Sequence, residues 1–339
     1  FLSYLVLYAG FGYDPFYFHM FSLLLHIGCV CLVWKLISSL LRVHGGVSEK
    51  QILYVNFITT LLFAVHPINV EAVAWISALG LLCYLRYIRT SKIFYYVLTI
   101  GCFLCSFWGK EQAVTFPLAL LIVDWFTNRN MKNLEVWSEK MSFLIMAFFF
   151  GIITVLSQGK GPYEMIFPLY QRLLFGCFAL VEYITKSLLP VNLNFFYPFP
   201  IVLGEEPPLH YYLYPVVLLF LMGWIIAYRN NRYLVFGVLL FLVNLLFSIH
   251  LFNMSRHAIV ADRYMYLSYV GIAFLIANGI WWLRKRLSYF KAALVFLFFY
   301  CFFLSVYTFH YTKKWENTTM VKKYTKEVLE KRLNGSNHL

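Results

Sequence analysis

A succession of long apolar runs, broken by short polar stretches, constrains this chain more than any other feature. The runs cover about residues 20–42, 53–66, 72–88, 93–108, 112–126, 141–157, 172–190, 210–228, 233–250, 265–283 and 290–310. A helix that crosses a bilayer needs about 20 mainly apolar residues. Hydrophobic residues make up 61% of the 339 and charged residues 13%, about half the charged share of a soluble domain. We therefore predict an all-α polytopic membrane protein with about 10–11 transmembrane helices in this chain.

The basic residues gather in breaks between these runs, and the net charge is +13. These breaks hold Arg42 to Lys50, Arg86 with Arg89 and Lys92, Arg129 with Lys132, Arg229 with Arg232, and Arg284 to Arg286. Because loops rich in Lys and Arg stay in the cytoplasm, we assign these breaks to the cytoplasmic side and the others to the opposite side. Membrane lipids with anionic headgroups are the expected partners, and nucleic acid is not expected. A bacterial inner membrane and an endoplasmic reticulum membrane both fit this multi-pass protein.

Two stretches do not fit a simple series of spans. The run after Trp75 has about ten apolar residues before Arg86, which is too few to cross a bilayer. The breaks on both sides of 172–190 belong to the extracytoplasmic side. One of the runs between 93 and 190 is therefore expected to be re-entrant or to lie in the interface.

The two ends of the chain differ from its middle. Residues 1–19 are aromatic and interrupted by Pro15 and two glycines, which predicts the end of a first extracytoplasmic loop. Residues 20–312 form the predicted transmembrane domain. Residues 313–339 are polar and favour a helix, so we predict a helical tail.

All seven cysteines lie within apolar runs. They are Cys29, Cys31, Cys83, Cys102, Cys105, Cys177 and Cys301. Cys102 and Cys105 have the spacing of a redox or zinc motif, but no polar flank or second pair accompanies them. Packed thiols are therefore expected, and the sequence predicts no metal site.

A short polar phrase from His66 to Trp75 stands between two apolar runs. His66, Asn69 and Glu71 are costly at a membrane boundary unless water, a headgroup or a ligand solvates them. Glu71 could orient an acceptor hydroxyl or bind a metal, and His66 could donate to a phosphate. The same phrase could instead be a capped helix start in the interface.

Other polar groups lie at further boundaries. Lys110-Glu111-Gln112 precedes an apolar run, where a lysine either suits a lipid-linked phosphate or reaches to the interface. Asp124, at the far end of that run, is expected to anchor in the interface. Arg172, Glu182 and Lys186 lie in or beside 172–190, where ionisable residues are either functional or pair helices.

The densest polar cluster runs from Arg256 to Tyr264 and includes Asp262 and Arg263. Arginine binds phosphate through two parallel hydrogen bonds, which suits a phosphate-containing ligand. An adjacent aspartate and arginine could equally be a structural pair.

Four phrases, in this order, carry a family resemblance. They are Phe16 to His19, Leu62 to Ser77, Trp108 to Pro117 and Ala261 to Leu267. They closely resemble the membrane part of the TPR-containing transmembrane O-mannosyltransferase-like proteins, a branch of the GT-C glycosyltransferases related to the protein O-mannosyltransferases. The segment from Leu189 to Pro198 also resembles the same family. The resemblance covers nearly the whole chain.

This resemblance implies a GT-C bundle that inverts the anomeric centre of a sugar, with mannose the first candidate. The donor would be a polyprenyl- or dolichyl-phosphate sugar, and the acceptor a Ser or Thr hydroxyl of a protein on the extracytoplasmic or lumenal side. It implies donor phosphate binding by Lys110, Gln112, Arg263 and Arg172, and a catalytic set of Glu71, His66 and Asp262 on the acceptor or sugar side. No cofactor beyond this lipid-phosphate sugar, which is a substrate, is expected, and no resident metal.

The chain departs from the family pattern in three places. The acidic first loop, which should supply the general base, is expected before Phe1, and Asp14 is the only carboxylate left there. Ala78 follows Ser77 directly, where the family has a charged stretch. The TPR array would begin near Trp315. These departures keep a second hypothesis open, in which the chain is a non-catalytic scaffold or a lipid-carrier transporter subunit of a larger membrane assembly.

Overall fold

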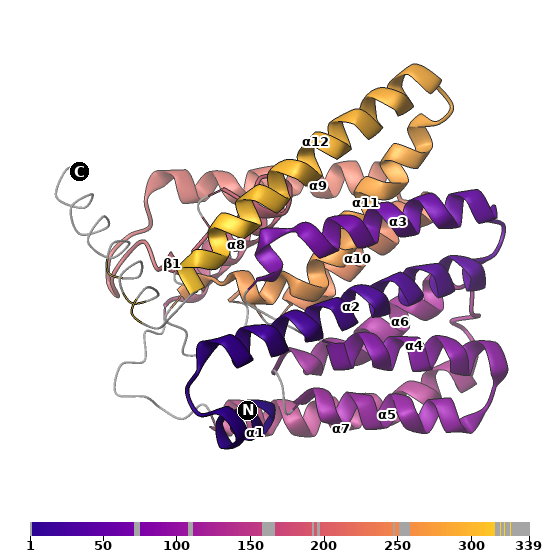
Figure 1. The fold of residues 1–339 in the computed structure, drawn as a ribbon, viewed down its shortest axis with the longest axis horizontal. Coiled ribbons are helices and arrows are strands. Elements are labelled where there is room, and N and C mark those ends of the chain that lie inside the picture. Colours follow the sequence, from indigo (N-terminus) through magenta and orange to yellow (C-terminus); the bar gives the residue numbers. More distant parts are fainter. Residues whose placement is uncertain are drawn as a thin grey trace.

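The chain folds into a helical bundle, shown by a computed structural model (Figure 1). The structure describes residues 2–70, 75–107, 111–157, 167–191, 193–194, 197–246, 248–250, 258–315, 319, 322 and 326. Within these residues the α-helices are α1 (Leu2–Phe11), α2 (Pro15–His44), α3 (Glu49–Val65), α4 (Trp75–Thr90), α5 (Ile93–Phe107), α6 (Phe116–Phe126), α7 (Leu134–Ser157), α8 (Leu169–Leu188), α9 (Leu213–Ala227), α10 (Arg232–Leu245), α11 (Met265–Leu283) and α12 (Leu287–Thr312). The short 3₁₀ helices are η1 (Pro67–Asn69), η2 (Glu111–Thr115), η3 (Leu209–Tyr212), η4 (Asp262–Tyr264) and η5 (Lys313–Trp315). Two short strands, β1 (Tyr197–Pro198) and β2 (Ala258–Val260), pair antiparallel.

Side-chain caps fix where several helices begin. The Asp14 carboxylate accepts a hydrogen bond from the Phe16 N–H at 3.0 Å, and Pro15 occupies the first turn of α2. The long helix therefore starts five residues before the boundary predicted at Met20. Ser48 caps α3 and Asn231 caps α10 in the same way.

Among the residues that the structure describes, five helical segments are long and apolar enough to cross a membrane. They are Pro15–His44, Leu134–Ile153, Leu209–Ala227, Asp262–Leu283 and Leu287–Thr312. Three shorter apolar helices accompany them, at Ile93–Phe107, Ala113–Phe126 and Arg232–Leu245. These helices confirm the prediction of an all-α polytopic membrane protein.

The centre of the bundle is α11, which packs against α3 on one side and α10 on the other. Gly237 and Gly271 allow the α10 contact, because a Cβ on Gly271 would collide with the Gly237 carbonyl oxygen.

In contrast to α11, helix α9 has no buried residue. A helix that is apolar all round and exposed in water would be unstable, so the α9 surface suits contact with lipid.

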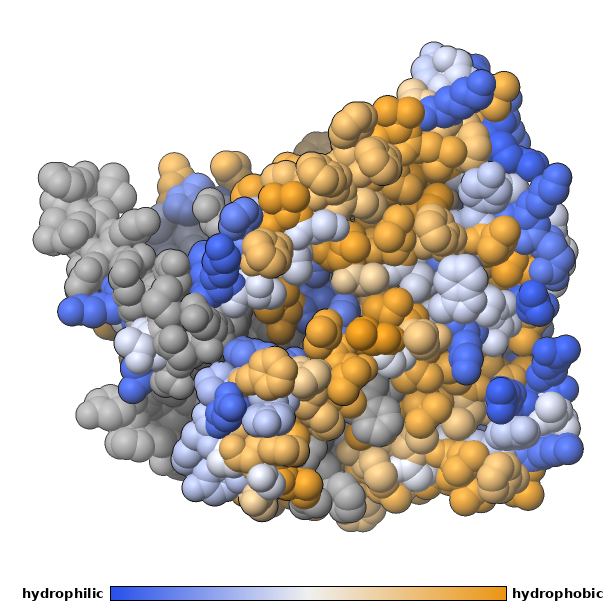
Figure 2. Space-filling model, viewed as in Figure 1, coloured by the Kyte–Doolittle hydropathy of each residue, from blue (hydrophilic) through white to orange (hydrophobic). Residues whose placement is uncertain are grey.

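The two ends of the bundle differ. The turns after α2, α4 and α11 lie together at one end, on the right in Figure 1, and hydrophilic residues gather along that edge in Figure 2. These turns contain three of the basic breaks in the sequence. The segments that carry the candidate site lie away from this edge, near β1 and the C-terminal end of α12 (Figure 1).

Candidate functional site

Several segments that are distant in sequence meet at the end opposite the basic turns. η1 contacts η4, and α8 contacts β2. The C-terminal half of α12 ties them together, because the Thr308 hydroxyl donates to the Val65 carbonyl and the Tyr300 hydroxyl donates to the Leu188 carbonyl, each at 2.8 Å. These contacts bring His66, in the link between α3 and η1, into one region with Asp262 of η4.

His66 is buried at the junction of α3 and η1, with 1% of its surface exposed. Its Nδ1 accepts a hydrogen bond from the Ile68 N–H at 3.3 Å, so the ring caps η1. The ring also packs on Tyr269 of α11, with centroids 4.2 Å apart. Burial lowers the pKa of His66 to about 3, and the Ser187 backbone opposes part of this shift. His66 is therefore neutral near pH 7, and because Nδ1 accepts a hydrogen bond, the ring proton lies on Nε2.

Asn69 closes the same turn from its other side. Its Nδ2 donates to the Phe63 carbonyl at 2.7 Å, which satisfies one of the free carbonyls at the end of α3. Thus residues 66–69 form a capped start of η1, but His66 and Asn69 are buried rather than solvated in the interface.

Asp262 is the buried carboxylate of the site, with 1% of its surface exposed. The Tyr197 hydroxyl donates to both of its oxygens, at 3.0 and 3.2 Å. The same hydroxyl oxygen accepts a hydrogen bond from the Asn194 N–H at 2.7 Å. Burial, followed by the nearby Asp262 charge, raises the pKa of Tyr197 well above its ordinary value, so the phenol remains a donor.

α8 supports the backbone just before Asp262. The Tyr183 hydroxyl accepts from the Ala261 N–H at 3.1 Å, and Tyr197 pairs with Val260 across the β1–β2 pair. Residues 260 to 262 are thus fixed from two directions, by α8 and by β1.

The candidate arginines occupy different places. The Arg263 guanidinium lies 5.2 Å from the centre of the Tyr264 ring, next to Asp262. Arg172 lies in the first turn of α8, about 16 Å along the helix from Tyr183. Its Nε is buried and has no hydrogen-bond partner among the described residues. Arg263 thus adjoins Asp262 in the sequence, with its guanidinium against the Tyr264 ring, and Arg172 lies further along α8.

The side chains of three predicted site residues are not among those that the structure describes. Glu71 and Lys110 lie outside the described residues, and Gln112 is placed through its backbone in η2, which packs against α5, α6 and α7. Their roles remain predictions. In the part of the chain that the structure describes, no three His, Cys, Asp or Glu side chains lie close enough to hold a metal ion. The seven cysteines are free thiols.

Sequence reasoning gave no individual role to Tyr183, Tyr197 or Tyr269. Tyr197 lies in the Leu189–Pro198 phrase, which carried the family resemblance but no predicted function. A tyrosine between apolar runs is also typical of interface anchoring, so nothing local indicated that it would contact Asp262.

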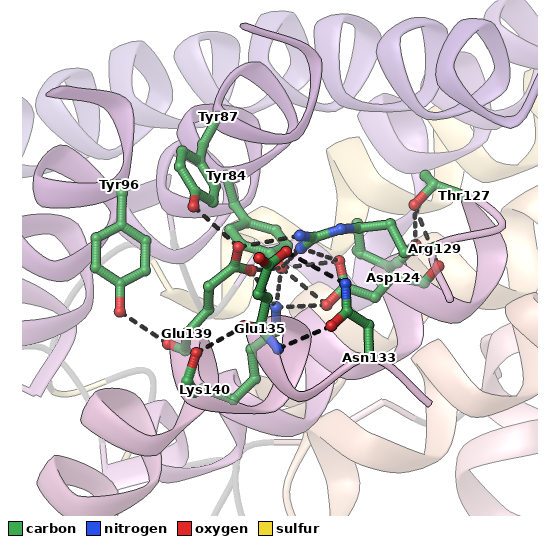
Figure 3. A network of polar contacts seen from close by, with 12 residues as sticks. Tyr84, Tyr87, Tyr96, Asp124, Thr127, Arg129, Asn133, Glu135, Glu139 and Lys140 are labelled. Atoms are coloured by element: carbon green, nitrogen blue, oxygen red, sulfur yellow. Dashed lines mark hydrogen bonds and ion pairs between the residues drawn. The ribbon is translucent and has the colours of Figure 1, made fainter. Parts of the chain in front are cut away.

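A second polar cluster lies at the end of the bundle that carries the basic turns, and it is shown in Figure 3. The Lys140 ammonium contacts the Tyr84 hydroxyl, the Asp124 carboxylate at 2.5 Å and the Glu139 carboxylate at 3.0 Å. The prediction that Asp124 anchors in the interface is wrong, because its side chain is fully buried in this ion cluster.

Arg129, in the turn after α6, completes the cluster. It binds both oxygens of Glu139, at 2.7 and 3.0 Å, and Asp124 at 3.2 Å. These contacts with Glu139 raise the pKa of Arg129, so it stays charged. Two cations thus balance two carboxylates, and the cluster joins α4, α6 and α7 without an unused donor on Lys140.

Comparison with known proteins places this chain near one group. It is 26% identical over 153 residues to Protein O-mannosyl-transferase Tmtc3 of Drosophila melanogaster and 28% identical over 177 residues to Protein O-mannosyl-transferase tmtc2 of Xenopus laevis. It is 32% identical over 153 residues to Protein O-mannosyl-transferase TMTC2 of Homo sapiens. These matches cover 36%, 47% and 40% of this chain, but 16%, 20% and 17% of the relatives.

No family model matches the chain, and no solved structure matches it. The similarity to these relatives confirms the resemblance to O-mannosyl-transferases. The GT-C fold and the TPR region remain predictions. The chain is a distant relative, over less than half of its length, of proteins named protein O-mannosyl-transferases.

Proposed function

We propose that this chain is the membrane domain of an inverting glycosyltransferase. The sugar, with mannose the first candidate, would pass from a polyprenyl- or dolichyl-phosphate donor to a Ser or Thr hydroxyl of a protein. The similarity to protein O-mannosyl-transferases supports the reaction class. The observation that carries the proposal is the oriented, buried carboxylate of Asp262 beside Arg263, at the end opposite the basic turns.

The transfer reaction requires two kinds of side chain. The acceptor hydroxyl must lose its proton as it attacks the anomeric carbon, and the bond from that carbon to the lipid phosphate oxygen must break. A carboxylate accepts the proton, and cations stabilise the departing lipid phosphate. The base that takes the proton is expected in the first loop, Asp262 and Glu71 are proposed to line the acceptor or sugar side, and Arg263 is the proposed phosphate contact.

The remaining predicted residues take supporting roles. Lys110, Gln112 and Arg172 are proposed to extend the phosphate-binding set along the same side of the membrane. His66 is neutral, so it can offer a hydrogen bond but not a positive charge to a phosphate.

The test is transfer by the full-length protein in lipid nanodiscs. Dolichyl-phosphate mannose and a Ser/Thr-rich peptide are supplied, and the peptide mass is followed. We expect mannosylated peptide, and a loss of about 100-fold in rate for Arg263→Gln, as for loss of one charge-stabilising group. Arg229→Gln, in a turn at the opposite end, is the matched control and should keep the parental rate. An equal rate for Arg263→Gln would remove Arg263 from the phosphate-binding set.

One observation favours the second hypothesis of a non-catalytic subunit. His66 and Asp262 are both nearly fully buried, as they would be in a closed structural site. The two hypotheses differ in donor binding. A scaffold would not bind dolichyl-phosphate mannose at its Asp262 end, whereas the transferase must. Failure to bind the lipid in nanodiscs, together with no transfer, would favour the scaffold.

A further inference from the structure

Tyr197 connects two segments that are 65 residues apart in the sequence. Its hydroxyl donates to the Asp262 carboxylate at 3.0 and 3.2 Å and accepts from the Asn194 N–H at 2.7 Å. The oxygen therefore has a donor fixed on one side and an acceptor fixed on the other. A phenol held in this way has one orientation of its O–H bond, and that orientation points at Asp262.

Lys186 lies over the ring of the same tyrosine. Its ammonium nitrogen is 4.0 Å from the ring centre, and 6% of the residue is exposed. Glu182, one turn earlier in α8, is 3.5 Å from the ammonium. A cation over an aromatic face draws electron density toward itself, and it thereby strengthens the phenolic O–H as a donor.

Lys140 is a second lysine of this kind, because its ammonium lies 4.6 Å from the centre of the Tyr84 ring. Lys140 is also buried, but its ammonium contacts three oxygen-bearing side chains. The Lys186 ammonium contacts the Glu182 carboxylate and the ring face of Tyr197. Burial of an ammonium against a ring requires a favourable interaction with that ring, since desolvation of the charge is costly.

We propose that Tyr197, with Lys186 over its ring, is a positioning residue that holds the Asp262 carboxylate in one orientation for sugar transfer. This inference rests on the proposed function, and it deepens it by assigning a role to the Leu189–Pro198 phrase. Among the described residues, the other charged or titratable groups around Tyr197 and Asp262 include Glu182 on α8, Tyr311 on α12 and Arg263 in η4.

The first experiment measures the carboxylate directly, without transfer. Infrared spectra of the protein in nanodiscs, labelled with ¹³C-aspartate, give the Asp262 carboxylate band by difference from Asp262→Asn. We expect Tyr197→Phe to shift this band, because one hydrogen bond to the carboxylate is lost. Tyr170→Phe is the matched control, since Tyr170 donates to Glu206 at 2.9 Å on the exposed surface, and it should leave the Asp262 band in place. An unchanged band in Tyr197→Phe overturns the proposal.

The second experiment separates positioning from binding. In the transfer assay we expect Tyr197→Phe to lower kcat about 10- to 100-fold, with the KM for the lipid donor unchanged, because a misplaced group slows the chemical step more than it weakens binding. Lys186→Met should lower kcat in the same way and Lys186→Arg should recover part of it. A rise in KM with kcat unchanged overturns the positioning role.

Two further results separate a failure of the positioning role from a folding defect and from a failure of the proposed function. If Tyr197→Phe does not fold, fluorotyrosine at position 197 retains the ring and hydroxyl but changes donor strength, and a band that stays constant across a fluorination series overturns the proposal. If Tyr197→Phe shifts the band but the parent protein transfers no lipid-linked sugar, the proposed function fails while the Tyr197–Asp262 coupling stands.

Discussion

The Lys140 ammonium lies 2.5 Å from the Asp124 carboxylate, and both side chains are fully buried. This pair sits inside the cluster with Arg129 and Glu139, far along the sequence from the candidate site (Figure 3). Removing a charge from water costs several kcal/mol, and such a pair is tolerated only when each remaining donor and acceptor is also satisfied. The cluster meets that condition, so it acts as a connection between α4, α6 and α7.

Lys140→Met should therefore be strongly destabilising. The substitution leaves Asp124 and Glu139 with one cation between them, and breaking a buried pair in this way costs about 3–5 kcal/mol. Thermal unfolding in detergent, followed by circular dichroism, should show a large fall in Tm. The control is Arg42→Gln, which removes an exposed pair with Glu49 whose side chains are 56% and 77% exposed, and should cost at most about 1 kcal/mol.

The double variant Lys140→Met with Asp124→Asn extends this test. It restores the balance of charge, so it should be less destabilised than the sum of the two single variants. Strict additivity would mean that the two side chains do not interact, contrary to their 2.5 Å separation.

Gly271→Ala should weaken the α10–α11 contact. A Cβ at this position would collide with the Gly237 carbonyl oxygen and lie 2.8 Å from the Phe241 nitrogen, and these are backbone atoms that cannot rotate away. We expect a loss of about 1–3 kcal/mol, measured as a lower Tm. Gly223→Ala on α9 is the control, because nothing lies within 4 Å of its Cβ, and it should be neutral or slightly stabilising.

The positions of several helices could be predicted from the sequence, because a membrane-spanning helix is visible as a long apolar run. The run predicted at 265–283 coincides with α11 (Met265–Leu283), and the run at 210–228 contains α9. The start of α2 at Pro15 also has a sequence signal, in Asp14 followed by proline, but the aromatic residues and glycines before Met20 favour a loop with an interfacial helix. Helix starts are set by one or two hydrogen bonds, which periodicity does not report.

The side-chain partners could not be predicted in this way. Asp124 meets Lys140 from another helix, and Tyr197 meets Asp262 across 65 residues, so neither pairing leaves a fixed spacing in the sequence. The sequence selected Asp262 and His66 because charged or polar residues at a membrane boundary are rare. It could not show that His66 packs against Tyr269 and is buried, which changes the chemistry available to it.

His66 should make stability depend on pH. Burial lowers its pKa from 6.5 to about 3, so between these values the unfolded chain binds a proton that the folded chain does not. Stability is therefore full above about pH 6.5 and falls as the pH drops toward 3, by up to about 1.4 kcal/mol per pH unit for one proton. The measurement is Tm against pH for the parent and for His66→Gln.

The expected result is a flatter acid limb for His66→Gln than for the parent protein. His210→Gln, which changes an exposed histidine in η3, serves as the control and should keep the parental slope. Curves of equal slope for the parent and His66→Gln would show that His66 is protonated in the folded protein, against its burial beside Tyr269.

The two ends of the bundle should face opposite sides of the membrane. Lys92 lies in the basic turn between α4 and α5, and Leu203 lies in the exposed loop between β1 and α9. Because loops rich in Lys and Arg remain cytoplasmic, Leu203→Cys should react with a membrane-impermeant maleimide in vesicles that expose the extracytoplasmic side, and Lys92→Cys should react only after permeabilisation. The parent protein measures the background from its own thiols. Reaction of Lys92→Cys from the outside would invert the topology, and it would place the Asp262 end in the cytoplasm, where the proposed acceptor hydroxyl on the extracytoplasmic or lumenal side could not reach it.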